Sequence, residues 1–372
     1  KAEDEKDKSR LAKLTHVYKE ESSEEKSCIP SLAEHCEWNK TQLKNIKDCL
    51  FAITGRNALP EATHSFITKI VYMMKQKKFY DLEDKEMYDQ EAIDMKYARD
   101  FHMSKYTPIK HWKLHPDREV CVDFTYKPDI EKRIITLNKK RMINVYEKPD
   151  IKPDPKADTD LFWALLKHVI PHDDERNHFL DWFTYQVQNP GKKIRHAIIL
   201  QSDDFQIGKG SLFDLFRLMV GWNNTRKIEL AEALDKGKGF LVNAQTVLMD
   251  EAKSSGSWSE KAMLINTLKT MITEGTVGIR QLYKEYEEQD TCTNYWINTN
   301  YKDAFNLPPR EVRYWVYFSP AKQNLNLLNE FHDAKDNYNL AGGVLAELLD
   351  RDISKFKPKA PAPWTQYRDQ MS

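Results

Sequence analysis

The feature that most constrains the fold is a polar loop ending in Gly208 and Lys209, which lies between an apolar segment and a helix-like segment. Such a strand, loop and helix bind phosphate, because free N–H groups at the helix start and one ammonium surround the anion. About 40 residues further on, a second apolar segment ends in Asp250 and Glu251. That pair supplies a carboxylate for a metal and a base for water. Together the two halves predict a nucleotide-hydrolysing P-loop domain.

The phosphate-binding loop departs from the pattern G-x-x-x-x-G-K-[ST]. Asp203 replaces the first glycine, Gly210 replaces the hydroxyl residue, and Ser211 comes one residue later, about 100° around a regular helix. Either the loop adjusts so that Ser211 joins Asp250 as a Mg²⁺ ligand, or water fills that position. The residues expected to bind nucleotide are Gln206, Ile207, Gly208, Lys209, Gly210, Ser211 and Leu212, with Lys209 on the β- and γ-phosphates.

Three further residues are expected to serve hydrolysis. Glu251 is positioned to polarise the attacking water, and Asn300, at the end of an apolar strand, to bind the γ-phosphate or that water. Arg313 precedes another apolar strand and is out of line with its own loop, so it fits an arginine finger offered to a neighbouring subunit. Arg310 competes for that role. A turn asparagine and a salt-bridging arginine are the plain alternatives.

Residues 275–286 predict a β-hairpin with a basic and aromatic tip. The tip carries Arg280, Tyr283 and Lys284, a combination that grips a nucleic-acid backbone and stacks on bases. Composition alone favours an ordinary solvated hairpin.

The overall charge excludes one class of protein. The 372 residues include 57 basic and 57 acidic side chains, so the net charge is zero and the chain is not a wholly basic nucleic-acid-binding domain. A local basic channel remains open, because a sum hides the distribution of charge.

Cysteine usage and hydropathy indicate an intracellular protein that does not enter a membrane. The five cysteines have irregular spacing and no C-x₂-C pair, which favours reduced thiols over a zinc site built from Cys28, His35, Cys36 and Cys49. No apolar run reaches the roughly 18 residues of a membrane span. The chain begins at Lys1 without Met, so we expect a fragment of a longer protein.

The sequence predicts an α/β fold in three parts. We expect a mostly helical N-terminal collar with a few strands (residues 1–150), a nucleotide-hydrolysing domain (151–322) and a small helical tail (323–372). A proline-rich stretch at residues 148–155 marks the linker between the first two. Predicted helices cover residues 41–115, 158–169, 174–187 and 344–349, predicted strands lie near 120–124, 134–135 and 142–146, and residues 194–318 alternate strands with helices, which implies a parallel sheet between helices.

The order of these motifs resembles that of the superfamily 3 helicases of viruses and phages, which are AAA+-like ATPases that form hexameric rings and translocate on DNA. Residues 181–193 resemble the segment before the P-loop in the D5-type branch, and the Gly-Lys-Gly-Ser run resembles a Gly-Lys-Gly-Thr variant found there. Lys284, sixteen residues before Asn300, matches the lysine that contacts DNA in the ring channel. Asn300 matches the sensor asparagine, and Arg313 matches the finger supplied in trans. The resemblance covers roughly residues 140–372.

The resemblance implies a homohexameric ring that uses ATP and Mg²⁺ and moves on single-stranded DNA. It further implies a covalent link to a primase-polymerase, of the kind known from a deep-sea vent phage, and a place in the cytoplasm of an infected host cell. Two other functions stay open: a packaging or remodelling ATPase, and a ring that tethers a polymerase through a weakly hydrolysing P-loop. Asp203 and Gly210 motivate the last of these.

Overall fold

The computed structural model describes residues 61–102, 104, 106–234, 241, 243–250, 258–279, 287–301, 304, 307–308, 311–335 and 338–368. The predicted N-terminal arm and the possible zinc ligands near residue 36 lie outside them. The chain divides into two compact units, the first made of Lys1–Asp123 and Ile134–Ile143, the second of Phe124–Arg133 and Asn144–Ser372.

The first unit combines short helices with two groups of strands. Its helices and strands are α4 (Glu61–Lys69), β1 (Ile70–Met73), β2 (Lys78–Asp81), β3 (Met87–Tyr88), α5 (Gln90–Lys96), α6 (Pro108–Leu114), β4 (Glu119–Cys121), β6 (Ile134–Leu137) and β7 (Lys140–Asn144), while β5 (Asp123–Thr125) crosses the boundary between the units. Strands β3, β2, β1 and β4 form one sheet in that order, and β6 pairs with β7 as an antiparallel hairpin.

The expectation that helices cover residues 41–115 is wrong in part, because β1, β2 and β3 lie among α4, α5 and α6 in the described part of that range. The apolar spacing of residues 66–74 continued past Lys69, but the helix ends there and Ile70–Met73 forms a strand between β2 and β4. Ile70, Val71 and Tyr72 are β-branched or aromatic, and these residues pack well on a sheet. A short apolar run fits either period, so pairing partners decided the outcome.

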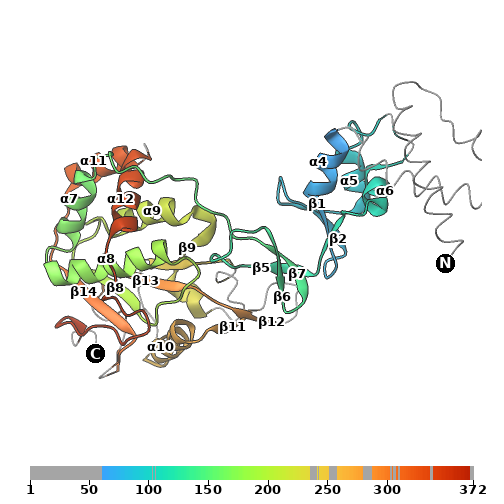
Figure 1. Cartoon of the computed structure of the whole chain (residues 1–372). Helices are drawn as coiled ribbons and strands as arrows, with labels where there is room; N and C mark the ends of the chain where they lie inside the picture. Colours follow the sequence, from blue (N-terminus) through green and yellow to red (C-terminus); the bar gives the residue numbers. More distant parts are fainter. Residues whose placement is uncertain are drawn as a thin grey trace, which may run out of the picture. The chain divides into compact units, whose positions relative to one another are not determined.

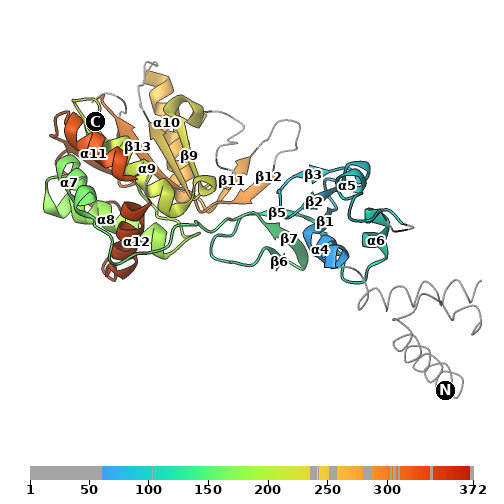
Figure 2. The same cartoon turned by 90° about the horizontal axis from the view of Figure 1, so that it is seen from above.

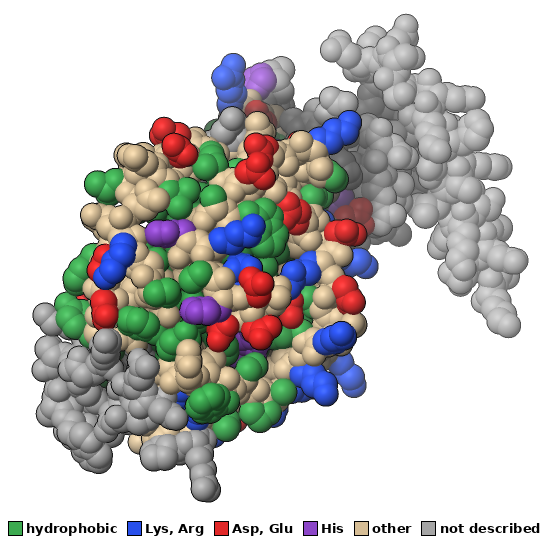
Figure 3. Space-filling model, turned by 90° about the vertical axis from the view of Figure 1, so that its left-hand side faces the viewer, with side chains coloured by type: hydrophobic (Ala, Val, Ile, Leu, Met, Phe, Trp, Pro, Cys, Tyr) green, Lys and Arg blue, Asp and Glu red, His purple; other side chains and the backbone are tan. Residues whose placement is uncertain are grey.

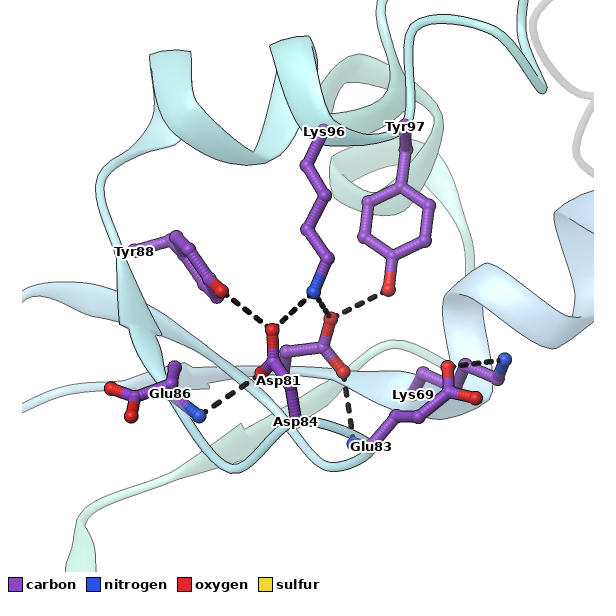
Figure 4. Close-up of polar contacts among 8 residues, drawn as sticks. All are labelled: Lys69, Asp81, Glu83, Asp84, Glu86, Tyr88, Lys96 and Tyr97. Carbon is purple, nitrogen blue, oxygen red and sulfur yellow. Dashed lines mark hydrogen bonds and ion pairs between the residues drawn. The ribbon is translucent and has the colours of Figure 1, made fainter.

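A buried carboxylate ties the β2–β3 turn to α5 (Figure 4). Asp81 is fully buried, and it accepts hydrogen bonds from Lys96 Nζ at 2.6 Å and from the Tyr97 hydroxyl at 2.5 Å. Lys96 also contacts Asp84. Burial would lower the pKa of Lys96, but the hydrogen bonds to the two carboxylates outweigh it and raise that pKa. The cluster is a satisfied ion network that fixes α5 on the sheet.

The second unit is a parallel sheet between layers of helices (Figures 1 and 2). Figure 1 shows α10 on one side of the sheet and α7, α9, α11 and α12 on the other. The strand order is β14-β8-β13-β10-β9, and every pair is parallel. Its elements are α7 (Asp160–Val169), α8 (Asp173–Gln188), β8 (Ala197–Ser202), α9 (Lys209–Val220), η1 (Trp222–Asn224), β9 (Thr225–Glu229), η2 (Leu230–Leu234), β10 (Thr246–Asp250), α10 (Trp258–Thr273), β11 (Thr276–Ile279), β12 (Glu287–Asp290), β13 (Asn294–Thr299), β14 (Tyr314–Ser319), α11 (Leu325–Lys335) and α12 (Asn339–Asp350).

The α/β fold class is confirmed, with mixed sheets in the first unit and helices after β14. The helices predicted at residues 158–169 and 174–187 are α7 and α8. A hairpin does form at the predicted place, from β11 and from β12, which lies just beyond the predicted range of 275–286. The proline-rich stretch has no helix or strand.

Trp296 at the middle of β13 anchors the helix that follows the P-loop. It is fully buried, with its ring centroid 5.3 Å from that of Phe213 on α9 and 5.2 Å from that of Phe179 on α8, both edge to face. Edge-to-face aromatic pairs add about 0.5–1.5 kcal/mol beyond the area they bury. This packing fixes the start of α9 against the sheet.

Charged side chains of both signs are mixed on the face shown in Figure 3, without one dominant patch. That mixing agrees with the zero net charge of the chain. Among the described residues, no helix is long and apolar enough to cross a membrane, and no cluster of His, Cys, Asp and Glu has the arrangement of a metal site.

Candidate functional site

The loop from β8 to α9 has the backbone of a tight strand-to-helix turn. Gly208 caps α9 with a φ of 109°, and Gln206 is also left-handed at 54°. A Cβ at Gly208 would lie 2.5 Å from Leu165 Cδ1, so both backbone and space demand glycine there. The loop therefore makes a tight turn directly before α9.

Lys209 is buried at the carboxyl edge of the sheet. Its ammonium donates to Ser202 Oγ at 2.7 Å and to the Thr299 carbonyl at 2.9 Å. Burial lowers the pKa of Lys209 to about 8, and the charge of Asp250 offsets part of that effect. The lysine thus lies between β8 and β13, as the sequence predicts for a phosphate ligand.

Asn300 holds the other side of the same loop. Its amide donates to the Ser202 carbonyl at 3.1 Å and to the Asp204 carbonyl at 2.7 Å. The Ser202 hydroxyl in turn donates to the Asp204 carbonyl at 2.7 Å. The asparagine predicted as a sensor is therefore in direct contact with the start of the P-loop.

Asp250 lies at the end of β10, on the same edge of the sheet, and is partly buried. One carboxylate oxygen accepts from Asn298 Nδ2 at 3.3 Å, and the other lies 2.7 Å from Lys227 Nζ. Parallel strands bring their carboxyl ends to one edge, which is where α/β proteins bind ligands. Lys209 and Asp250 are thus separated by a single strand, β13.

Ser211 reaches out of the first turn of α9 toward α11. Its hydroxyl lies 3.2 Å from His332 Nε2. At Gly210, a Cβ would meet nothing within 4 Å, so packing does not require glycine there. The hydroxyl predicted as a metal ligand is therefore engaged by a histidine from the C-terminal helices.

The acidic residues of the loop lie differently from one another. Asp204 contacts Lys322 Nζ at 3.1 Å and the Gln323 N–H at 3.4 Å, so its charge is directed to the segment before α11. Asp203 is exposed. These contacts offset the charge of Asp204 and so reduce the repulsion that it would exert on a phosphate in the loop.

Arg313 lies at the opposite end of the sheet from Lys209. Its carbonyl accepts the Ala197 N–H at the start of β8, five residues before Ser202, so it is about 17 Å from the P-loop edge. Its guanidinium donates to Glu311 at 3.0 Å, and Lys269 lies 3.1 Å from the same carboxylate. Burial would raise the pKa of Glu311, but these two cations outweigh it and lower that pKa. Arg313 cannot serve its own P-loop.

Several predicted residues lie outside the described part of the chain. They are Glu251, Arg280, Tyr283 and Lys284, together with the alternative finger Arg310.

Four residues at the site were missed by the sequence reasoning. Ser202, Lys227, Asn298 and His332 contact Lys209, Asp250 or Ser211. Ser202 carried a usable signal, since it is the polar residue that ends the strand before the loop. Asn298 sits inside an apolar run, and the other two come from segments without any motif.

The residues present fit a nucleotide and Mg²⁺. An ammonium has three N–H donors, and two of those of Lys209 bond described residues, which leaves one for a phosphate oxygen. The N–H groups of the first helical turn lack intrahelical partners and favour an anion. Asp250 and Ser211 supply oxygen ligands, which Mg²⁺ prefers.

Comparisons with known proteins agree with this architecture. Residues 200–313 match a family of unknown function, DUF5906, and this segment contains Lys209, Asp250, Asn300 and Arg313. No curated protein matches the sequence.

Solved structures with a similar fold include the NrS-1 C-terminal region. Its apo structure aligns with a TM-score of 0.66 at 17% identity, over 84% of this chain and 73% of that one. A second apo form aligns with a TM-score of 0.63 at 17% identity, over 84% of this chain and 74% of that one. A JCV helicase aligns over 52% of this chain and 55% of that one at 13% identity with a TM-score of 0.35, too low to relate the folds. The NrS-1 alignments show a shared fold across both units.

Proposed function

We propose that this protein is an ATP-dependent DNA helicase that assembles as a homohexameric ring. One observation carries the proposal: Lys209, Asn300 and Asp250 converge on one edge of a parallel sheet, on either side of β13. That arrangement joins a phosphate-binding ammonium to a metal-organising carboxylate, as hydrolysis of ATP requires.

The residues take separate roles in this proposal. Lys209 and the first N–H groups of α9 bind the β- and γ-phosphates, and Asp250 and Ser211 hold Mg²⁺, which would neutralise phosphate charge. Glu251 orients water and accepts its proton, and Asn300 positions the γ-phosphate. Nucleotide binding by the individual residues from Gln206 to Leu212 remains a prediction.

Arg313 supports a site shared between subunits. An arginine about 17 Å from its own loop can act on nucleotide only if another subunit's loop lies beside it. Glu311, which also pairs with Lys269, holds its guanidinium at the sheet's amino end. A closed ring supplies such a neighbour to every subunit.

The proposed helicase translocates on single-stranded DNA, which Lys284 binds together with Arg280 and Tyr283, in the segment between β11 and β12. The fold shared with the NrS-1 C-terminal region supports a parent protein with further domains, and we propose a covalently linked primase-polymerase acting in the cytoplasm of a phage-infected cell.

The test measures ATP turnover and strand displacement by the purified chain, with and without single-stranded DNA. The proposal expects turnover that DNA stimulates, its loss in Lys209→Ala, and rings in negative-stain images. Lys284→Ala should keep basal turnover and lose unwinding. Lys148→Ala, which removes an exposed pair with Glu131, is the matched control and should behave as the parent. ATP turnover that neither responds to DNA nor unwinds it would favour a packaging or remodelling ATPase.

A second function follows from the contacts of Ser211 and Asp250. Both predicted metal ligands are engaged by basic side chains, His332 and Lys227. A ring that binds nucleotide, hydrolyses it poorly and tethers a polymerase to DNA would tolerate this. Robust ATP turnover by the purified chain would exclude it.

A further inference from the structure

Three lysines of the first unit occupy a left-handed backbone conformation. Lys77, Lys85 and Lys139 have φ values of 54°, 64° and 64°, and each lies in a turn between antiparallel strands. Residues other than Gly, Asn and Asp are disfavoured there, because the Cβ crowds the backbone. Each turn therefore carries lysine at a conformational cost.

The β6–β7 turn shows the cost most clearly. Its two central residues, Asn138 and Lys139, both have positive φ, at 48° and 64°. This is a two-residue hairpin loop, for which Asn-Gly is the favoured pair. Asn138 matches the preference, and Lys139 stands where glycine would be more stable.

The position of Lys85 in a strained turn has an electrostatic explanation within the chain. Its turn also contains Glu83, Asp84 and Glu86, and the buried Asp81 begins it (Figure 4). Three carboxylates therefore lie within two residues of Lys85 in the sequence. Strain alone therefore does not indicate a ligand, and the charge around each lysine decides.

No carboxylate lies within two residues of Lys77 or Lys139 in the sequence. Both are exposed, and within the described ranges neither forms an ion pair, nor does Lys140. Asn and Gln flank them rather than carboxylates. Neither ammonium therefore has an anionic partner among the described residues.

The turns of Lys77 and Lys139 are neighbours in the fold. The Val122 N–H donates to the Arg141 carbonyl at 2.8 Å, and the Val122 carbonyl accepts from the Lys75 N–H at 3.2 Å. Lys75 and Arg141 thus flank one residue, about 10 Å apart by two strand spacings. Each is two residues from its strained lysine, so the two turns flank Val122.

These turns concentrate positive charge in a chain of zero net charge. Against their cations stand three carboxylates, namely Asp123 at 2.7 Å from Lys75, Asp89 at 3.6 Å from Lys78, and Glu119 at 2.6 Å from Arg141. The basic turns, as we name them, are Lys75, Lys77, Lys78, Lys139, Lys140 and Arg141. Their cations outnumber the paired carboxylates six to three.

We propose that the basic turns contact the phosphate backbone of DNA. This inference rests on the proposed function for the identity of the polyanion, and it adds a contact separate from Lys284. The basic turns contain no aromatic residue, so the contact is electrostatic and independent of base sequence. Single strands and duplexes offer the same phosphate chemistry.

Fluorescence anisotropy of the full chain tests the inference, with a labelled single strand and the matching duplex at several salt concentrations. The variants are Lys77→Gly, Lys139→Gly and the double change, with Lys85→Gly as the matched control. Each lysine lost from the basic turns should weaken binding to all sequences and reduce the salt slope by about 1. Glycine suits the turn, so the Tm of Lys139→Gly should not fall. Lys85→Gly should bind DNA as the parent does.

The outcomes separate this inference from the proposed function. A double variant with the parental affinity and slope overturns the inference while leaving the helicase intact. If Lys85→Gly weakens DNA binding equally, the inference is also overturned, because the effect would then come from the loss of any positive charge and not from the basic turns. A parent chain that binds neither DNA overturns both. The salt slope is measured for the single strand and for the duplex. The DNA form for which the double variant loses more of this slope is the form that the basic turns contact.

Discussion

The ammonium of Lys227 lies 2.7 Å from the carboxylate of Asp250, the group proposed to hold Mg²⁺. Lys227 comes from the edge strand β9, where its Cα pairs with Leu248 of β10. Asn298 bonds the other carboxylate oxygen. In the proposed site, magnesium would therefore compete with Lys227 for the carboxylate of Asp250.

Lys227→Met should strengthen metal binding. The pair is partly exposed, so its loss should lower the Mn²⁺ dissociation constant by up to about fivefold, the equivalent of about 1 kcal/mol. Electron paramagnetic resonance with Mn²⁺ and ADP measures this without turnover. Lys148→Met is the control, since it breaks an exposed pair away from the site. Weaker metal binding in Lys227→Met would show that Lys227 helps to build the site.

Two glycines of the P-loop should respond oppositely to alanine. Gly208→Ala forces a Cβ to 2.5 Å from Leu165 at a φ of 109°, so it should lower the free energy of unfolding by about 2 kcal/mol or more. Gly210→Ala meets open space and should leave the Tm unchanged or higher, because alanine favours helix. ATP affinity should change little in Gly210→Ala, because the pattern G-x-x-x-x-G-K-[ST] carries a side chain at this position. Thermal melts and nucleotide titrations check both, and a stable Gly208→Ala would contradict the backbone argument.

The stacked histidines His178 and His196 should make the second unit sensitive to acid. Their Nε2 atoms are 3.2 Å apart, and burial lowers the pKa of His178 to about 4 and of His196 to about 3. The unfolded chain binds these protons near pH 6.5, so their contribution is complete above that pH and is lost as the pH falls toward 4. In that window, each histidine should lower the free energy of unfolding by roughly 1.4 kcal/mol for each unit by which the pH falls.

Urea unfolding at pH 7, 6 and 5 measures that loss. His178→Gln should reduce the slope of stability against pH to about half. At pH 8 neither protein should change with pH through these residues. A variant with the parental slope would show that other groups cause the acid sensitivity.

Arg313 and Lys209 should complement one another between subunits. Arg313→Ala and Lys209→Ala should each abolish ATP turnover when pure. In a mixture assembled together at equal amounts, about one quarter of the interfaces combine an intact Lys209 with an intact Arg313, and turnover should recover accordingly. Lack of recovery in confirmed mixed rings would contradict action in trans.

The sequence was most informative where motif and periodicity agreed. The apolar strand before the loop, Lys209, and the strand ending in Asp250 were placed correctly on the same sheet edge, because parallel strands share that edge. Helices α7 and α8 were located within two residues. The roles of these residues remain proposals.

The errors came from interactions that local sequence does not encode. Strand β1 continued the apolar spacing of α4, and only its partners β2 and β4 distinguish it from helix. The contacts of Lys227 with Asp250 and of His332 with Ser211 join segments more than twenty residues apart. Such pairs depend on the packed fold and cannot be obtained from spacing.

The last two residues of β13 and the residue that follows the strand connect the two halves of the site. Asn298 bonds Asp250, the Thr299 carbonyl accepts from Lys209, and Asn300 holds the loop at Ser202. The strand fixes the spacing between these three contacts, because its backbone is hydrogen-bonded to β8 on one side and to β10 on the other. A sliding of β13 by one residue would reverse its side chains and misalign metal and phosphate ligands together. Loss of activity from core changes at Trp296 would then report a lost alignment rather than a lost ligand.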